Sequence, residues 1–177
     1  MTDPASAVLP TPVRANGAFL FRHPAHLLAL GFGSGLSPVA PGTVGTLWAW
    51  LAFTAINAIL QPTDLQWGLL IATSLLAGWW ASVVTARNLG VADPGAVVID
   101  EIAAFWLVLW LLAPAGWATQ LVAFGLFRFF DAAKPGPVGW ADRLFKGFGW
   151  RGAFGILFDD LVAAFCTLLV IAVWRIW

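Results

Sequence analysis

Five carboxylate side chains lie beside the long apolar runs of this 177-residue sequence, where an isolated charge is costly. They are Asp100, Glu101, Asp131, Asp159 and Asp160. Carboxylate oxygens suit hard cations, and Mg²⁺ typically takes one or two protein carboxylates together with waters and a phosphate. We therefore expect all five residues to serve one or two Mg²⁺ ions, with Asp100 or Asp160 as the catalytic base.

The alternative for each acidic pair is a solvated helix N-terminus, where the helix dipole favours negative charge. Zinc is not expected, because the chain has only two His and one Cys and they form no cluster with zinc-ligand spacing. The number of metal ions stays open at this point.

A glycine-rich stretch, "GSGLSPVAPGTVGTL" at residues 33–47, precedes an apolar run. Pro41 comes just before the predicted start of a helix, and backbone N–H groups at a helix N-terminus bind anions. We expect a phosphate group to be bound there and by two cations near Asp131. The predicted substrate-binding residues are Ser34, Gly35, Gly42, Thr43, Thr46, Arg128 and Lys134. The alternatives are glycines that allow close packing and cations that anchor the chain at the membrane surface.

The composition indicates which elements must position these residues. Sixty per cent of the residues are hydrophobic and 10% are charged, whereas soluble domains carry about 25% charged residues. Twelve Trp residues suit membrane–water interfaces. The sequence therefore predicts an all-α, polytopic membrane protein. A net charge of zero gives no indication of a nucleic-acid partner.

About five transmembrane helices are predicted, preceded by a short interfacial or re-entrant helix at 25–32. Three runs are long enough to cross a bilayer, and two shorter ones flank a turn at 114–116. The five runs are 43–60, 66–86, 102–113, 116–130 and 161–177. Residues 138–156 are predicted to lie on the membrane surface. We expect residues 1–18 to be flexible and 19–177 to form a single helical membrane domain.

This arrangement sorts the charges onto one side of the membrane. All Lys and Arg residues except Arg175 fall on the side where the five acidic residues lie. The positive-inside rule makes that side cytoplasmic. We therefore expect the site to face the cytoplasm.

Several motifs, taken in order, resemble the phosphatidylglycerophosphatase A family. They are "HLLALGFGSGLSPVAPGTVGTL", "DEIAAFW", "FRFFDAAKPGP", "DR" at 142–143 and "GILFDDLVAA", and they span most of residues 25–165. The resemblance implies a phosphoric monoester hydrolase of the bacterial inner membrane. Such an enzyme uses Mg²⁺ to convert phosphatidylglycerophosphate to phosphatidylglycerol and inorganic phosphate.

Carried over by position, the family's acidic motifs fall on three places in the sequence. These are Asp100 with Glu101, Asp131 with Lys134, and Asp159 with Asp160, while the glycine-rich motif falls on residues 33–46. Asp93, in "VADPG", also matches. The sequence departs from the family where Gly136 follows Pro135 and in a longer stretch between Asp142 and Asp159, so the loop near the lipid headgroup differs.

Two other classes of protein remain as alternatives. Another metal-dependent lipid headgroup enzyme is one, although the Asp-Gly-x-x-Ala-Arg run of the transferases is absent. A small cation transporter or channel is the other, but that class places carboxylates near the middle of the bilayer. The sequence leaves open whether water or an Asp attacks the phosphate, and leaves the oligomeric state unknown.

Overall fold

The computed structural model describes residues 12–176, and within that range its regular secondary structure is entirely helical, with no strand. Residues 1–11 of the predicted flexible segment lie outside the described range. The elements are α1 (Gly17–Leu20), α2 (Pro24–Ala29), the 3-10 helix η1 (Gly31–Leu36), α3 (Pro41–Leu60), α4 (Asp64–Leu89), α5 (Ile99–Leu112), α6 (Trp117–Ala133), α7 (Pro137–Leu144) and α8 (Trp150–Ile176). The predicted all-α class is confirmed.

Three helices are long and apolar enough to cross a membrane, namely α3, α4 and α8. Helices α5 and α6 have 14 and 17 residues. At 1.5 Å per residue they are about 21 and 26 Å long, less than the ~30 Å hydrocarbon core of a bilayer. The structure therefore supports three of the five predicted spans on length and composition.

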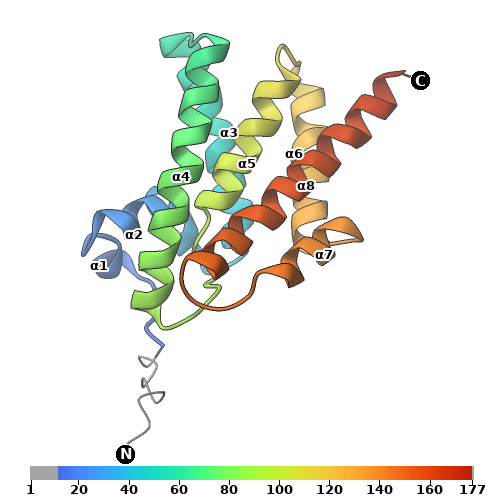
Figure 1. The fold of residues 1–177 in the computed structure, drawn as a ribbon. Coiled ribbons are helices and arrows are strands. Elements are labelled where there is room, and N and C mark those ends of the chain that lie inside the picture. The colour runs from blue at the N-terminus through green and yellow to red at the C-terminus, as the bar shows by residue number, and fades with distance from the viewer. Residues whose placement is uncertain (1–11, 177) are drawn as a thin grey trace, which may run out of the picture.

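Helix α5 occupies the centre of the bundle and packs against α3, α4 and α8. Figure 1 shows α3, α4, α5 and α6 running alongside one another, with α8 crossing them at an incline. Most apolar side chains of α5 are buried, Phe105 and Val108 fully, whereas Leu111 near its end is exposed. A helix that is apolar on all sides belongs inside such a bundle.

The two ends of the bundle carry different connections. The short turns between α3 and α4 and between α5 and α6 lie at one end, at the top of Figure 1. The opposite end carries α1, α2, the loop 90–98, α7 and the start of α8. We call these the turn end and the loop end.

Local chemistry explains where α4 begins and ends. A capping box starts it, because the Thr63 side chain accepts a hydrogen bond from Gln66 N and the Gln66 side chain accepts one from Thr63 N. Gly90, at φ +69°, ends it in the left-handed conformation that glycine favours. Below this end, Val13 N donates to Leu89 O at 2.9 Å, so the chain before α1 is tied to α4.

The region from 138 to 161 differs from the prediction. Only α7 forms a short separate helix, and α8 begins at Trp150, well before the expected residue 161. Gly152 and Gly155 are helical positions where the preceding segment packs closely. A Cβ atom there would lie 1.6 Å from Gly147 O and 2.1 Å from Phe145 O, respectively. Asp159 and Asp160 therefore lie about three turns inside α8 and not at its N-terminus.

Candidate active site

A cavity of about 150 Å³ opens at the loop end, where α5, α6, α8 and the loop 90–98 meet. Its acidic wall residues are Asp93, Asp100, Glu101, Asp131, Asp159 and Asp160. Lys134 is the cationic residue among the described residues that line it. The structure thus brings together all five acidic residues selected from the sequence, and adds Asp93.

Three helices deliver these side chains to one place. Asp100 and Glu101 stand in the first turn of α5, Asp131 near the end of α6, and Asp159 inside α8. The loop before α5 is fixed by a hydrogen bond from Val98 N to Ala29 O at 2.9 Å. The α6 chain runs toward the loop end and the α5 chain away from it, so their acidic ends coincide.

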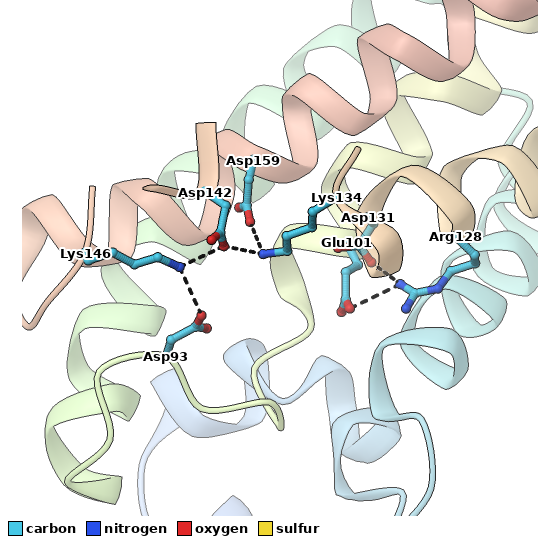
Figure 2. A network of polar contacts seen from close by, with 8 residues as sticks. All are labelled: Asp93, Glu101, Arg128, Asp131, Lys134, Asp142, Lys146 and Asp159. Carbon is cyan, nitrogen blue, oxygen red and sulfur yellow. Dashed lines mark hydrogen bonds and ion pairs between the residues drawn. The ribbon is translucent and has the colours of Figure 1, made fainter. Parts of the chain in front are cut away.

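Arg128 forms the first of two ionic clusters at the cavity (Figure 2). Its Nη1 donates to Glu101 Oε1 at 3.3 Å and also to Asp131 Oδ2. The same nitrogen donates to Thr46 Oγ1 at 3.3 Å, which connects the cluster to α3. Gly42 lies so close that a Cβ atom there would be 1.9 Å from Glu101 Oε1. We call this group the Arg128 cluster.

Lys134 forms the second cluster, which Figure 2 shows beside the first. Its Nζ donates to Asp159 Oδ2 at 2.5 Å and to Asp142 Oδ1. Lys146 Nζ donates to the same Asp142 oxygen at 2.7 Å and lies 4.0 Å from Asp93 Oδ2. We call this group the Lys134 cluster.

The pairing in the Lys134 cluster fixes the charges of its members. Burial alone would lower the pKa of Lys134, but hydrogen bonds to Asp142 and Asp159 outweigh it and raise that pKa. Burial would likewise raise the pKa of Asp142, but hydrogen bonds from Lys134 and Lys146 lower it to about 2. Both partners are therefore charged at neutral pH.

Four carboxylate oxygens at the cavity are buried and accept no hydrogen bond from residues 12–176. They are Asp100 Oδ1, Glu101 Oε2, Asp159 Oδ1 and Asp160 Oδ2. Asp100 and Asp160 are only 6% and 3% exposed, so bulk water does not compensate for the missing partners. The wall is strongly acidic and suits a cation in addition to Lys134.

No three His, Cys, Asp or Glu residues within 12–176 are arranged as ligands around one point. Glu101 and Asp131 are engaged by Arg128, and Asp159 is engaged by Lys134. The assignment of the five acidic residues as metal ligands therefore stays a prediction.

The glycine-rich loop lies apart from the cavity wall, which includes none of residues 33–46. The Ser34 hydroxyl donates to Gly31 O at 2.8 Å, and a Cβ atom at Gly35 would lie 2.0 Å from Ala96 O. The close-packing alternative thus describes Gly35. Phosphate binding by Ser34, Gly35 and Thr43 remains a prediction. Gly42 and Thr46 approach the site only through the Arg128 cluster.

Sequence reasoning gave no role to Asp142 and Lys146, which complete the Lys134 cluster. An Asp four residues before a Lys is the usual pattern of a solvated surface pair, so the spacing conceals the role. Asp142 belonged to a recognised motif, "DR" at 142–143, and that was the one signal available.

The fold and the cavity define a helical membrane protein with an acidic polar site at one end of its bundle. The family model of Phosphatidylglycerophosphatase A matches residues 27–175, and the chain belongs to this family. The resemblance noted from the motifs is confirmed.

Individual relatives are similar in sequence to this chain over most of their own length. The chain is 38% identical to Phosphatidylglycerophosphatase A of Escherichia coli K12, covering 84% of this chain and 82% of that one. It is 38% identical to the Haemophilus influenzae protein of the same name, covering 88% and 91%. A Bacteroides thetaiotaomicron protein named "Putative phosphatidylinositol-3-phosphatase" is also 38% identical, covering 84% and 92%. No solved structure matches the chain.

Proposed function

We propose that this chain is a phosphatidylglycerophosphatase, which hydrolyses phosphatidylglycerophosphate to phosphatidylglycerol and inorganic phosphate. The observation that carries the proposal is the acidic cavity with Lys134 on its wall, in a chain of this family. The reaction forms a bond from water oxygen to phosphorus and breaks the bond from phosphorus to the glycerol oxygen. The leaving oxygen takes up a proton.

Mg²⁺ fits the donor set of the cavity. The ligands would be Asp100, Glu101, Asp131, Asp159 and Asp160, and the four unpartnered oxygens favour a cation there. Glu101 and Asp159 each have one such oxygen, so both could bind the ion while their other oxygens stay with Arg128 and Lys134. When bound, Mg²⁺ neutralises phosphate charge and makes a bound water more acidic.

Side chains of the protein would bind the phosphate and accept the proton. Lys134 would hold the substrate phosphate with its ammonium, and Arg128 would add a second positive charge. Asp100 or Asp160 would accept the proton of the attacking water. Direct attack by an Asp, with an aspartyl-phosphate intermediate, is the alternative route.

The membrane arrangement that we propose has five spans, with α5 and α6 as a central hairpin. Short spans are accommodated by local thinning of the bilayer. The exposed cations Arg87, Arg143 and Arg151 all lie toward the loop end, and by the positive-inside rule they support a loop end that faces the cytoplasm at a bacterial inner membrane. A phospholipid could then present its headgroup to the cavity while its acyl chains stay in the bilayer.

The test is release of inorganic phosphate by the purified protein in lipid nanodiscs. We expect release from phosphatidylglycerophosphate with Mg²⁺ and loss of release after chelation by EDTA. Phosphatidylinositol-3-phosphate and phosphatidic acid serve as competing substrates. Preference for either would correct the substrate, and cation flux in proteoliposomes without phosphate release would favour the transporter alternative.

A further inference from the structure

We propose that Asp142 is a positioning residue for the phosphatase reaction, which aims the ammonium group of Lys134 at the acidic cavity. Lys146, in turn, anchors Asp142. This inference rests on the proposed function, because it concerns how the phosphate-binding charge of Lys134 is held. Neither Asp142 nor Lys146 lines the acidic cavity itself.

The contacts of Lys134 show what Asp142 contributes (Figure 2). The ammonium has three N–H donors, and two of them are directed to Asp142 Oδ1 and Asp159 Oδ2. Two carboxylates on different helices, α7 and α8, thus fix the ammonium. The third N–H group is left for a phosphate oxygen.

The backbone around Lys134 is built to bring α7 against it. Lys134 ends α6 at φ +46°, a conformation that is uncommon for residues other than glycine. Two residues later, Gly136 adopts φ +49° and ψ −111°, and Pro137 starts α7. At Gly139 a Cβ atom would lie 2.5 Å from Lys134 O. Strained backbone of this kind persists where the surrounding structure determines it, and it is common at functional sites.

Lys146 gives Asp142 a second partner on the solvent side. Both ammonium groups donate to the same atom, Asp142 Oδ1. The Lys146 side chain is 53% exposed, whereas that of Lys134 is 33% exposed. The ion pair with Lys146 holds the Asp142 carboxylate from the solvent side, so that it stays in place while the third N–H group of Lys134 contacts a phosphate.

A double-mutant cycle distinguishes positioning from a general structural role. The variants are Asp142→Asn, Lys134→Ala and the double variant, in nanodiscs with phosphatidylglycerophosphate and Mg²⁺. Asp142→Asn alone should lower kcat/KM by about 10-fold, with weaker inhibition by inorganic phosphate, as for groups that orient a ligand. In the Lys134→Ala background the same change should cost less than about 2-fold, since coupled residues are not additive.

Controls keep the cycle interpretable. Arg143→Gln changes an exposed cation on the same helix and should leave kcat/KM unchanged. Asp142→Glu keeps the charge and should retain more activity than Asp142→Asn if both variants keep the thermal unfolding midpoint of the wild type. Lys146→Gln removes the exposed partner of Asp142 and should lower kcat/KM by less than Asp142→Asn does.

Two results would overturn the inference. Independent, additive losses from Asp142→Asn and Lys134→Ala would give Asp142 a separate role. Wild-type kinetics in Lys134→Ala would leave Asp142 nothing to position. Both outcomes are compatible with a working phosphatase, whereas wild-type protein that releases no phosphate would refute the proposed function and this inference together.

Discussion

The two ends of the bundle handle buried polar groups in opposite ways. At the turn end, indole N–H groups pair with neutral or solvated partners. Trp50 Nε1 donates to Gln120 Oε1 at 2.6 Å, and Trp67 Nε1 donates to Asn57 Oδ1 at 3.1 Å. Gln120 Nε2 also donates to Ala115 O at 2.8 Å. These contacts hold α3, α4 and α6 together without buried charge.

At the loop end, carboxylates outnumber the cations that face them, and four of their oxygens are unpartnered within the described residues. An uncompensated charge in a membrane protein destabilises the fold and is typically retained for function. We infer that the groups that stabilise the fold and the groups that carry the chemistry lie at opposite ends of the bundle. Substitutions at the loop end should therefore impair catalysis, and those at the turn end should impair stability.

The largest effect is expected for Asp160→Asn. The change keeps the size of the side chain and removes the charge that would bind metal or accept a proton. Phosphate release should fall by at least about 100-fold, the lower bound for an acid–base group. Thermal unfolding in detergent should show that the variant is at least as stable as the wild type, because a buried charge is gone. Wild-type rates would remove Asp160 from the site.

Lys134 should show the next largest effect. Lys134→Ala removes the ammonium and should lower kcat/KM by about 10-fold to 100-fold, as for loss of a charge-assisted phosphate contact of roughly 1.5–3 kcal/mol. Lys134→Arg keeps the charge with a different shape and hydration, and should retain more activity. Initial rates across a substrate range at saturating Mg²⁺ measure both. Equal, mild losses in the two variants would leave Lys134 as a membrane-surface anchor.

Gly42→Ala tests the contact between α3 and the Arg128 cluster. The added Cβ atom would collide with Glu101 Oε1, and the carboxylate would have to leave its place beside Arg128. We expect kcat/KM to fall by about 10-fold, on the scale of displaced supporting groups at metal sites. Gly125→Ala is the matched control, because a Cβ atom at Gly125 on α6 meets nothing within 4 Å. Equal activity in both variants would mean that Gly42 serves packing alone.

The sequence was sufficient to predict those parts of the structure that depend on a single strong pattern, either an apolar run or a charge beside one. Apolar runs bounded by Pro41 and by "QPTD" predicted α3 within two residues of its observed start. Acidic residues beside apolar runs predicted the wall of the cavity, because charge is conspicuous there. The predicted start of the last helix at residue 161 was wrong, because α8 begins at Trp150, where Gly152 and Gly155 pack closely against residues 145–147.

The Lys134 cluster shows why part of the site was not predictable. Its partners come from α6, α7 and α8, and only the folded arrangement brings Asp142 beside Lys134. The left-handed conformation of Lys134 likewise depends on packing against α7. In the glycine-rich loop the composition matches an anion site, but close packing of Gly35 against Ala96 accounts for that glycine equally well, so phosphate binding there stays a prediction.

The smallest effect is expected at the turn end, where Gln120→Leu would leave Trp50 Nε1 without its acceptor. Hydrogen bonds between membrane helices average about 0.6 kcal/mol, so the unfolding midpoint should fall modestly. The double variant Trp50→Phe with Gln120→Leu should recover part of that loss, because it leaves no unpaired indole N–H, although Ala115 O still loses its bond from Gln120. Phosphate release should stay within about 2-fold of wild type in both variants, since sites without shared partners act independently. A large loss of kcat/KM with unchanged stability would show that the two ends are coupled, and the separation along the bundle axis would have to be abandoned.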